Sequence, residues 1–94
     1  MNKKIGIVAA TKMEIAPLLN DGPPANTKIC ITGIGSVSTT YNLLLFIQKE
    51  KPDFLLQAGI AGCFDKKIPL SSFFVVRKDC FADLGVMENK KWIN

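Results

Sequence analysis

The sequence predicts an α/β protein built around a small parallel sheet. Three short apolar runs, at residues 4–10, 28–33 and 53–58, are each followed by turn residues, and a helical pattern separates the last two. Runs of this length between turn signals are typical of strands buried on both faces. Because strands and helices alternate, the strands should pair in parallel through right-handed crossovers. We therefore expect at least three parallel strands.

The first strand, 4–10, leads into a short helix. Thr11 is expected to cap this helix, because Glu14 follows at the Thr-x-x-Glu spacing of a capping box. Pro17 limits the regularity of the helix. A loop is expected over residues 20–27, which contain the sequence Asn-Asp-Gly-Pro-Pro.

The second strand, 28–33, ends in the turn Gly33-Ile34-Gly35, and Ser36 or Ser38 is expected to cap the helix that follows. This helix should cover residues 37–49. It has one apolar face at positions 37, 41, 44 and 45 and a second apolar side at 43, 46 and 47. We therefore expect it to be covered on more than one face.

The third strand, 53–58, ends in a loop that carries Gly59 and Gly62. Glycines at the carboxyl end of a strand let the backbone approach a ligand closely, although they could also mark a tight exit from the strand. Another apolar run occupies 73–77, and 79–94 has no strong period. Because so small a parallel sheet leaves faces and an edge uncovered, we expect 1–94 to be a single α/β domain that is the N-terminal part of a longer protein.

Composition argues against several functional classes. The basic residues give a net charge of +4 but occur mostly as pairs with a single arginine, a pattern that does not favour nucleic-acid binding. The first apolar run is too short for a signal peptide or a membrane span, so no membrane partner and a cytoplasmic location are expected. Three cysteines without a Cys-x-x-Cys pair, and no histidine, suggest no metal site. We expect these cysteines to be reduced and mostly buried.

The absence of histidine also restricts the chemistry. Nucleophile systems of the Ser-His-Asp and Cys-His kinds are excluded in their usual form. Proton transfer must then fall to a carboxylate. The candidates are Glu14, Asp65, Asp79, Asp83 and Glu88.

Glu14 has two interpretations, which are about equally supported and not exclusive. It can serve as the partner of Thr11 in a capping box. It also lies just past the carboxyl end of the first strand, where open α/β sheets bind ligands. The sequence alone leaves both open.

The glycine turn resembles a dinucleotide fingerprint whose last glycine is replaced by Ser38. A dinucleotide fold also needs an acid at the far end of the next strand, and Asp53 stands at the near end. A small-ligand site is therefore favoured over a NAD site, and a purely structural turn stays as an alternative.

Three blocks resemble the nucleoside phosphorylase/nucleosidase superfamily. They are residues 6–14, 32–35 and 58–62, which occur in the family's order and span most of the chain together with the tail. Within that superfamily, residues 58–65 followed by 81–85 most resemble the futalosine hydrolases of menaquinone biosynthesis. The related methylthioadenosine/adenosylhomocysteine nucleosidases share the pattern.

The resemblance implies the N-terminal portion of a three-layer fold with a central twisted mixed sheet. It implies hydrolysis of the N-ribosidic bond of a purine nucleoside, with release of hypoxanthine from futalosine, no cofactor and a homo-oligomeric state. In the related nucleosidases the glutamate after the first strand orients or activates the attacking water, and Glu14 matches it.

The resemblance also implies further substrate-binding positions. One group lies beside the ribose and water, one forms the loop beside ribose and base, and one matches a segment that reaches a neighbouring subunit's site in dimeric relatives. These positions are, in order, Thr11, Gly33, Ile34 and Gly35; Gly59, Ile60, Ala61 and Gly62; and Phe81 with Asp83.

Departures from the family pattern are informative. Phosphorolytic relatives carry a serine where this chain has Ile60, and arginines that this chain lacks beside the glycine loop, so hydrolysis is favoured over phosphorolysis. The family's base-protonating acid and ribose-binding segment would follow Asn94, so residues 1–94 alone are expected to be inactive. The alternatives are a methylthioadenosine/adenosylhomocysteine nucleosidase, a purine nucleoside phosphorylase, or a non-catalytic half-domain for binding or assembly.

Overall fold

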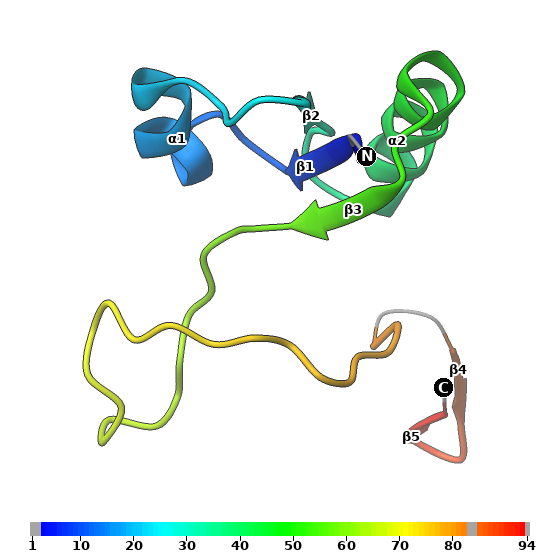
Figure 1. Cartoon of the computed structure of the whole chain (residues 1–94). Helices are drawn as coiled ribbons and strands as arrows, with labels where there is room; N and C mark the ends of the chain where they lie inside the picture. The colour runs from blue at the N-terminus through cyan, green and yellow to red at the C-terminus, as the bar shows by residue number, and fades with distance from the viewer. Residues whose placement is uncertain (1–2, 83–84, 94) are drawn as a thin grey trace. The chain divides into compact units, whose positions relative to one another are not determined.

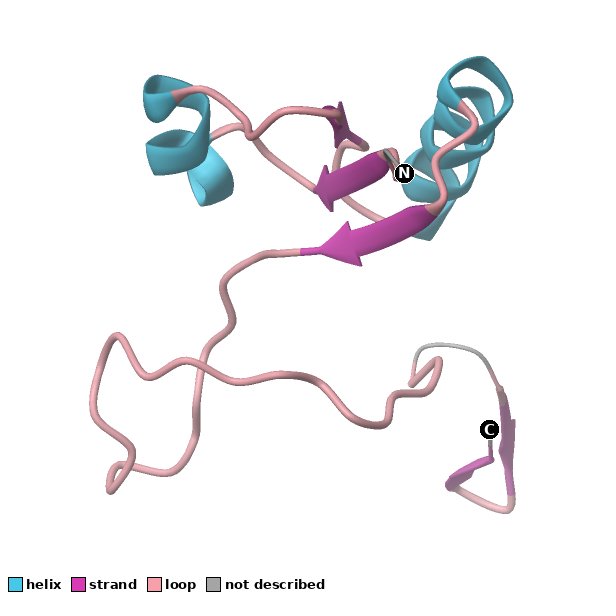
Figure 2. Ribbon diagram, in the orientation of Figure 1, coloured by secondary structure: helices cyan, strands magenta, loops and turns pink. Residues whose placement is uncertain are grey.

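The computed structural model describes residues 3–82 and 85–93 and divides into two compact units, Met1–Gly62 and Cys63–Asn94. The first unit contains a sheet with helices, and the second is mostly loop and ends in a hairpin (Figures 1 and 2). Within the described residues, no helix has both the length and the apolar character needed to span a bilayer.

The first unit alternates strands and helices in the predicted order. Its elements are β1 (Ile5–Ala9), the 3-10 helix η1 (Met13–Ile15), α1 (Ala16–Asp21), β2 (Thr27–Ile31), α2 (Ser36–Glu50) and β3 (Phe54–Gln57). The three strands form a parallel sheet in the order β2-β1-β3. The prediction of an α/β chain with three parallel strands is confirmed.

The central strand β1 forms the core. Ile7 pairs with Ile29 on one side and Leu56 on the other, and Val8 and Ala9 are only 4% and 0% exposed. All four residues of β3 are exposed, so the expectation that this strand is buried on both faces is wrong. The reason is its position, because β3 lies at the sheet edge and helix α2 packs mainly on β2, the strand at the other edge.

Helix α2 packs closely against the sheet through Phe46. A Cβ atom at Gly6 would lie 2.7 Å from Phe46 Cε2 and 2.9 Å from Leu55 Cδ2, so the packing depends on a residue without a side chain in β1. On the same face, the Cys30 thiol lies 3.9 Å from the carbonyl oxygen of Asn42. The helix therefore covers the sheet with its Asn42 and Phe46 side.

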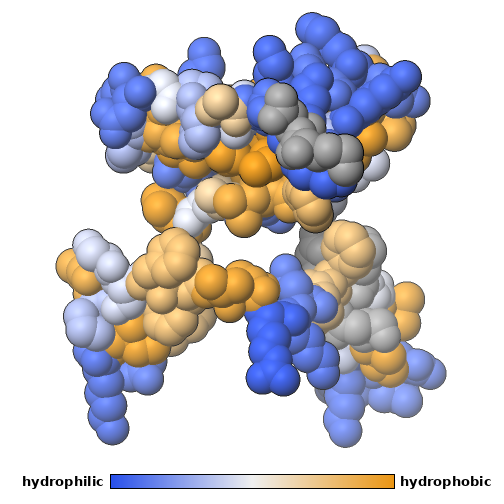
Figure 3. Space-filling view, in the orientation of Figure 1, coloured by the Kyte–Doolittle hydropathy of each residue, from blue (hydrophilic) through white to orange (hydrophobic). Residues whose placement is uncertain are grey.

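The other apolar face of α2 is open. Val37 is 85% exposed and Tyr41 64%, and Leu44 and Leu45 are also exposed. The expectation that more than one face of this helix is covered is therefore wrong for the described chain. In the view of Figure 3, apolar residues gather over the strands of this unit and hydrophilic residues over much of its helices.

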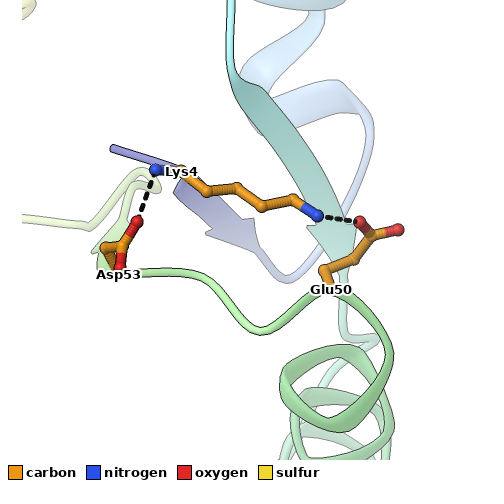
Figure 4. A network of polar contacts seen from close by, with 3 residues as sticks. All are labelled: Lys4, Glu50 and Asp53. Carbon is orange, nitrogen blue, oxygen red and sulfur yellow. Dashed lines mark hydrogen bonds and ion pairs between the residues drawn. The ribbon is translucent and has the colours of Figure 1, made fainter. Parts of the chain in front are cut away.

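A set of polar contacts ties the amino ends of β1 and β3 to the end of α2 (Figure 4). The Lys4 amide donates to Asp53 Oδ2 at 2.7 Å, and the Asp53 amide donates to the Lys4 carbonyl at 2.7 Å. Lys4 Nζ lies 2.8 Å from Glu50 Oε2, and this contact lowers the pKa of Glu50 below its ordinary 4.5. Asp53 is thus structural and stands at the sheet end opposite to that required for a dinucleotide.

The second unit ends in an antiparallel hairpin that the sequence argument missed. Strands β4 (Val86–Glu88) and β5 (Lys91–Ile93) are joined by Asn89 and Lys90, whose φ angles of 49° and 62° are those that a type I′ turn requires. Strands this short give almost no period in the sequence. The apolar run 73–77, described throughout, has no regular secondary structure.

All three cysteines are free thiols, as expected, but only Cys30 is buried. Burial raises the pKa of the Cys30 thiol above its ordinary value, which keeps it protonated at neutral pH. Cys63 and Cys80 are exposed, so the expectation of mostly buried cysteines is wrong for these two. Among the described residues of the second unit none is buried, so these offer no packed core that could cover the two thiols.

Candidate functional site

The strand order favours ligand binding at the carboxyl end of the sheet, called the ligand edge below. The connection from β1 leads to β2 on one side of this central strand, and the connection from β2 crosses back to β3 on its other side. In open α/β sheets such a reversal leaves a crevice outside the carboxyl ends of the strands, where ligands bind. The segments that follow β1 and β3 should therefore meet there.

The Glu14 carboxylate joins these two segments. Its Oε1 accepts a hydrogen bond from Thr11 Oγ1 at 2.9 Å, and its Oε2 accepts one from the Ile60 amide at 2.9 Å. The Glu14 amide donates to Thr11 Oγ1 at 3.4 Å. The local Thr11–Glu14 contact predicted from the capping-box spacing is present, although Lys12 rather than Thr11 is the N-cap of η1.

These contacts lower the pKa of Glu14 below its ordinary 4.5. The largest contribution is the hydrogen bond from the Ile60 amide, followed by the bond from the Thr11 hydroxyl, while partial desolvation opposes them. Glu14 is therefore ionised at neutral pH. An ionised carboxylate can accept a proton from water and can stabilise a positive charge that develops nearby.

Gly59 allows the carboxylate to approach the loop. A Cβ atom at Gly59 would lie 2.8 Å from Glu14 Oε2, whereas one at Gly62 would meet nothing within 4 Å. A close approach thus occurs at Gly59, whereas the predicted approach of this loop to a ligand stays a prediction. What approaches it in the structure is the chain's own carboxylate.

The glycine turn after β2 adjoins the same edge. Gly33 and Gly35 have φ angles of +81° and +94°, conformations that residues with a side chain rarely adopt. The Gly33 amide donates to the carbonyl of Ala10, the residue before Thr11, at 3.0 Å. The predicted turn is therefore confirmed and is tied to the Glu14 segment.

Capping of α2 differs from the prediction. Gly35 is the N-cap, and no side chain makes a capping hydrogen bond. Ser38, one of the two predicted caps, instead donates to the Thr32 carbonyl. Its hydroxyl reaches back to the end of β2 because the positive-φ turn brings that carbonyl alongside the helix.

The side chains of the other predicted residues are exposed or belong to other parts of the chain. Ile34 and Ile60 are 80% and 73% exposed, and Ala61 and Gly62 are also exposed. Phe81 belongs to the second unit, and Asp83 lies outside the described residues. The cluster around Glu14 is thus built from residues of the first unit.

Of the remaining carboxylate candidates, Asp65 and Asp79 make local contacts. Asp65 Oδ1 accepts a bond from the Lys67 amide at 2.9 Å, and Asp79 Oδ1 accepts one from the Cys80 amide at 2.7 Å. Open hollows of about 320 and 310 Å³ are lined by Asp79 and Cys80 together with Phe81 or Lys78. In ranges 3–82 and 85–93, no three Cys, Asp or Glu residues group as metal ligands would.

Two curated proteins match most of the chain. The 5′-methylthioadenosine/S-adenosylhomocysteine nucleosidase of Maridesulfovibrio salexigens is 29% identical over 90 residues, which cover 77% of this chain and 39% of that protein. The nucleosidase of the same name from Buchnera aphidicola subsp. Schizaphis graminum is 26% identical over 101 residues, which cover 88% of this chain and 43% of that protein. The chain is distantly similar to these nucleosidases.

This similarity supports a relationship to the nucleosidase superfamily and leaves the substrate open. The chain spans about two fifths of the length of the nucleosidases it matches. No family model and no solved structure matches it.

Sequence reasoning missed a partly buried polar cluster around Thr32. Ser38, Thr39 and Asn42 all make hydrogen bonds to Thr32. The signal that could have revealed the cluster is Asn42 itself, a poor helix former surrounded in sequence by apolar residues.

Proposed function

We propose that this chain carries the carboxylate side of a nucleosidase site, which hydrolyses the N-ribosidic bond of a purine nucleoside. The observation that carries the proposal is the position of Glu14. Its ionised carboxylate stands at the strand-order reversal, between the segment after β1 and the Gly59–Ile60 loop. The distant similarity to two nucleosidases supports the same reaction class.

In the proposed reaction, Glu14 acts on the attacking water. As the bond from the ribose carbon to the base nitrogen breaks, the sugar gains positive charge and the electron pair leaves with the base. The water oxygen bonds to the ribose carbon, and Glu14 accepts the proton that the water releases. The base takes up a proton from an acid that we place outside residues 1–94.

Hydrolysis is proposed rather than phosphorolysis because the loop offers few side chains that could donate hydrogen bonds to a bound phosphate. A bound phosphate dianion needs several charged or amide donors. The loop instead presents the apolar side chain of Ile60, which is 73% exposed, and neither the loop nor the segment after β1 contains an arginine.

Three candidate substrates follow from two different observations. The resemblance of residues 58–65 and 81–85 to futalosine hydrolases favours futalosine, and the named relatives favour 5′-methylthioadenosine or S-adenosylhomocysteine. We propose a purine nucleosidase in either case. The full-length form is proposed to be a cytoplasmic homo-oligomer without a cofactor.

A base-release assay tests the proposal. The 94-residue chain, and any longer product of its reading frame, are incubated with futalosine or 5′-methylthioadenosine, with and without phosphate, and free base is measured by chromatography. We expect release of base from one nucleoside without phosphate by the longer product, and none from the 94-residue chain. Strict dependence on phosphate would contradict hydrolysis, and efficient release by the 94-residue chain would contradict the placement of the acid.

A non-catalytic binding or assembly module is the second candidate. It is favoured by the open apolar face of α2, where Val37 and Tyr41 are 85% and 64% exposed. Size-exclusion chromatography and circular dichroism of the 94-residue chain test it. A well-folded monomer that stays monomeric at high concentration would count against assembly.

A further inference from the structure

A partly buried polar cluster lies behind the glycine turn, with the carbonyl of the buried residue Thr32 at its centre. Ser38 Oγ donates to this carbonyl at 2.5 Å, and Asn42 Nδ2 donates to it at 2.9 Å. Asn42 Nδ2 also lies within hydrogen-bond distance of the Ser38 carbonyl, at 3.0 Å. Because Thr32 is only 2% exposed, water cannot readily replace these bonds.

The other polar groups of Thr32 are also engaged. Its hydroxyl donates to the Gly33 carbonyl at 3.0 Å and accepts a bond from Thr39 Oγ1 at 3.4 Å. Its amide donates to the carbonyl of Ala9 in β1 at 2.9 Å. The last residue before the turn is thus held by β1 on one side and by α2 on the other.

Asn42 occupies a position where asparagine is unfavourable. It lies well inside α2 between Tyr41 and Leu43, and its side chain would ordinarily compete with the helix for backbone hydrogen bonds. Here the side chain reaches back to Thr32. Since no side chain caps α2, this contact and that of Ser38 with the same carbonyl link the helix to the preceding turn.

We propose that Asn42 is a positioning residue that fixes the Gly33–Gly35 turn at the ligand edge of the sheet. By anchoring the Thr32 carbonyl to α2, it holds Gly33 at φ +81° with its amide on the Ala10 carbonyl. Thr11 follows Ala10 directly, so Asn42 sets the position of the glycine turn relative to the segment that carries Thr11 and Glu14. This inference concerns the turn and holds whatever the chain binds.

Amide hydrogen exchange on the 94-residue chain, followed by NMR, tests the proposal. Asn42→Leu removes the donors while keeping a side chain of similar size and improving helix propensity. We expect exchange of the Gly33 amide to accelerate about tenfold, as for the loss of one buried hydrogen bond. The Ala58 amide, which bonds to the Val8 carbonyl at 2.9 Å between β1 and β3, should be unaffected.

Thr40→Ala is the matched control, because Thr40 is an exposed polar residue of the same helix that bonds to the Ser36 carbonyl at 2.7 Å. It should leave Gly33 exchange unchanged. Unchanged Gly33 exchange in Asn42→Leu, or equal acceleration of Gly33 and Ala58, would overturn the proposal.

Asn42→Asp provides a rescue that a general packing defect would not show. A protonated carboxyl can donate to the Thr32 carbonyl, whereas a carboxylate cannot. The Gly33-to-Ala58 exchange ratio should therefore fall toward the wild-type ratio as the pH is lowered through the pKa of the introduced group. A ratio that does not change with pH would contradict the proposal, even if Asn42→Leu fails to fold.

Discussion

The Glu14 carboxylate and the Ile60 amide, 46 residues apart in the sequence, are joined by a hydrogen bond of 2.9 Å. The bond crosses the point at which the strand order reverses and connects the segment after β1 to the loop after β3. It also makes the largest contribution to the lowered pKa of Glu14. The geometry of the loop and the charge of the carboxylate are therefore coupled.

In the longer product of the reading frame, where we expect base release, Glu14→Gln should abolish most of the turnover. The amide keeps an oxygen that can accept the Ile60 bond, but it loses the charge and the ability to take a proton. We expect a loss of about a hundredfold or more in kcat, as for removal of a general base. Base release should be compared with Glu50→Gln, since Glu50 pairs with Lys4 at the opposite end of the sheet. Turnover close to normal in Glu14→Gln would leave Glu14 with a structural role.

Gly59→Ala should break the bond between Glu14 and Ile60. The added Cβ would stand 2.8 Å from Glu14 Oε2, closer than such contacts allow. We expect the pKa of Glu14 to rise toward its ordinary 4.5, measured by NMR titration of its side-chain carboxyl carbon. Gly62→Ala is the matched control, because a Cβ there meets nothing within 4 Å. Equal titration of the two variants would show that Gly59 has no special role.

Acid should weaken the fold through Glu14. Because its pKa is lower in the folded chain than the ordinary 4.5, the unfolded chain binds the proton first as the pH falls. The contribution of Glu14 to stability is complete above 4.5 and disappears as the pH falls through the folded-state pKa. Glu50, whose pKa is also lowered, acts in the same direction.

The free energy of unfolding in urea, measured from neutral pH to below 4.5, checks this expectation. Glu14→Gln should make the unfolding free energy depend less steeply on pH, and the double variant with Glu50→Gln should weaken this dependence further. A slope identical to that of the parent in both variants would contradict the assignment.

Gly6→Ala should loosen the packing of α2 on the sheet. The new methyl group would lie 2.7 Å from the Phe46 ring and 2.9 Å from Leu55, and overpacking of this kind costs about 1–3 kcal/mol. Urea denaturation measures the loss. Phe46→Leu in the same chain should recover part of it by vacating space, whereas additive losses would show that the two residues do not share a contact.

Lys4→Met should have a small effect that depends on salt. The Lys4 and Glu50 side chains are 37% and 19% exposed, and exposed ion pairs contribute about 0.2–1 kcal/mol. The unfolding free energy should fall by no more than this at low salt, and the difference from the parent should shrink at high salt. A larger loss of unfolding free energy that does not depend on salt would mean that the aliphatic part of the Lys4 side chain contributes more than its charge.

The sequence predicted the local elements well because each depends on neighbouring residues. The three strands follow from apolar runs, and the Thr11–Glu14 contact follows from a spacing of three. The bond from Glu14 to Ile60 could not be predicted from the residues alone, because it depends on β3 pairing beside β1 rather than beside β2.

The failures have the same physical origin. A run such as Phe54–Gln57 has the composition of a buried strand whether it lies at the centre of a sheet or at its edge. Which side of α2 packs on the sheet is decided by the missing side chain of Gly6, outside the helix. Asn42 contradicts its local helical pattern because its partner, Thr32, lies in the turn before the helix.

The strand order also has a consequence for how the chain folds. β1 is synthesised before β2 and β3, yet one of its two edges stays unpaired until β3 is available, and the Lys4–Asp53 bond closes a separation of 49 residues. Contacts so distant in sequence form slowly, because the intervening chain must be ordered first. During translation, the Glu14 edge can be completed only after Ile60 has left the ribosome, so this edge is among the last parts of the first unit to assemble.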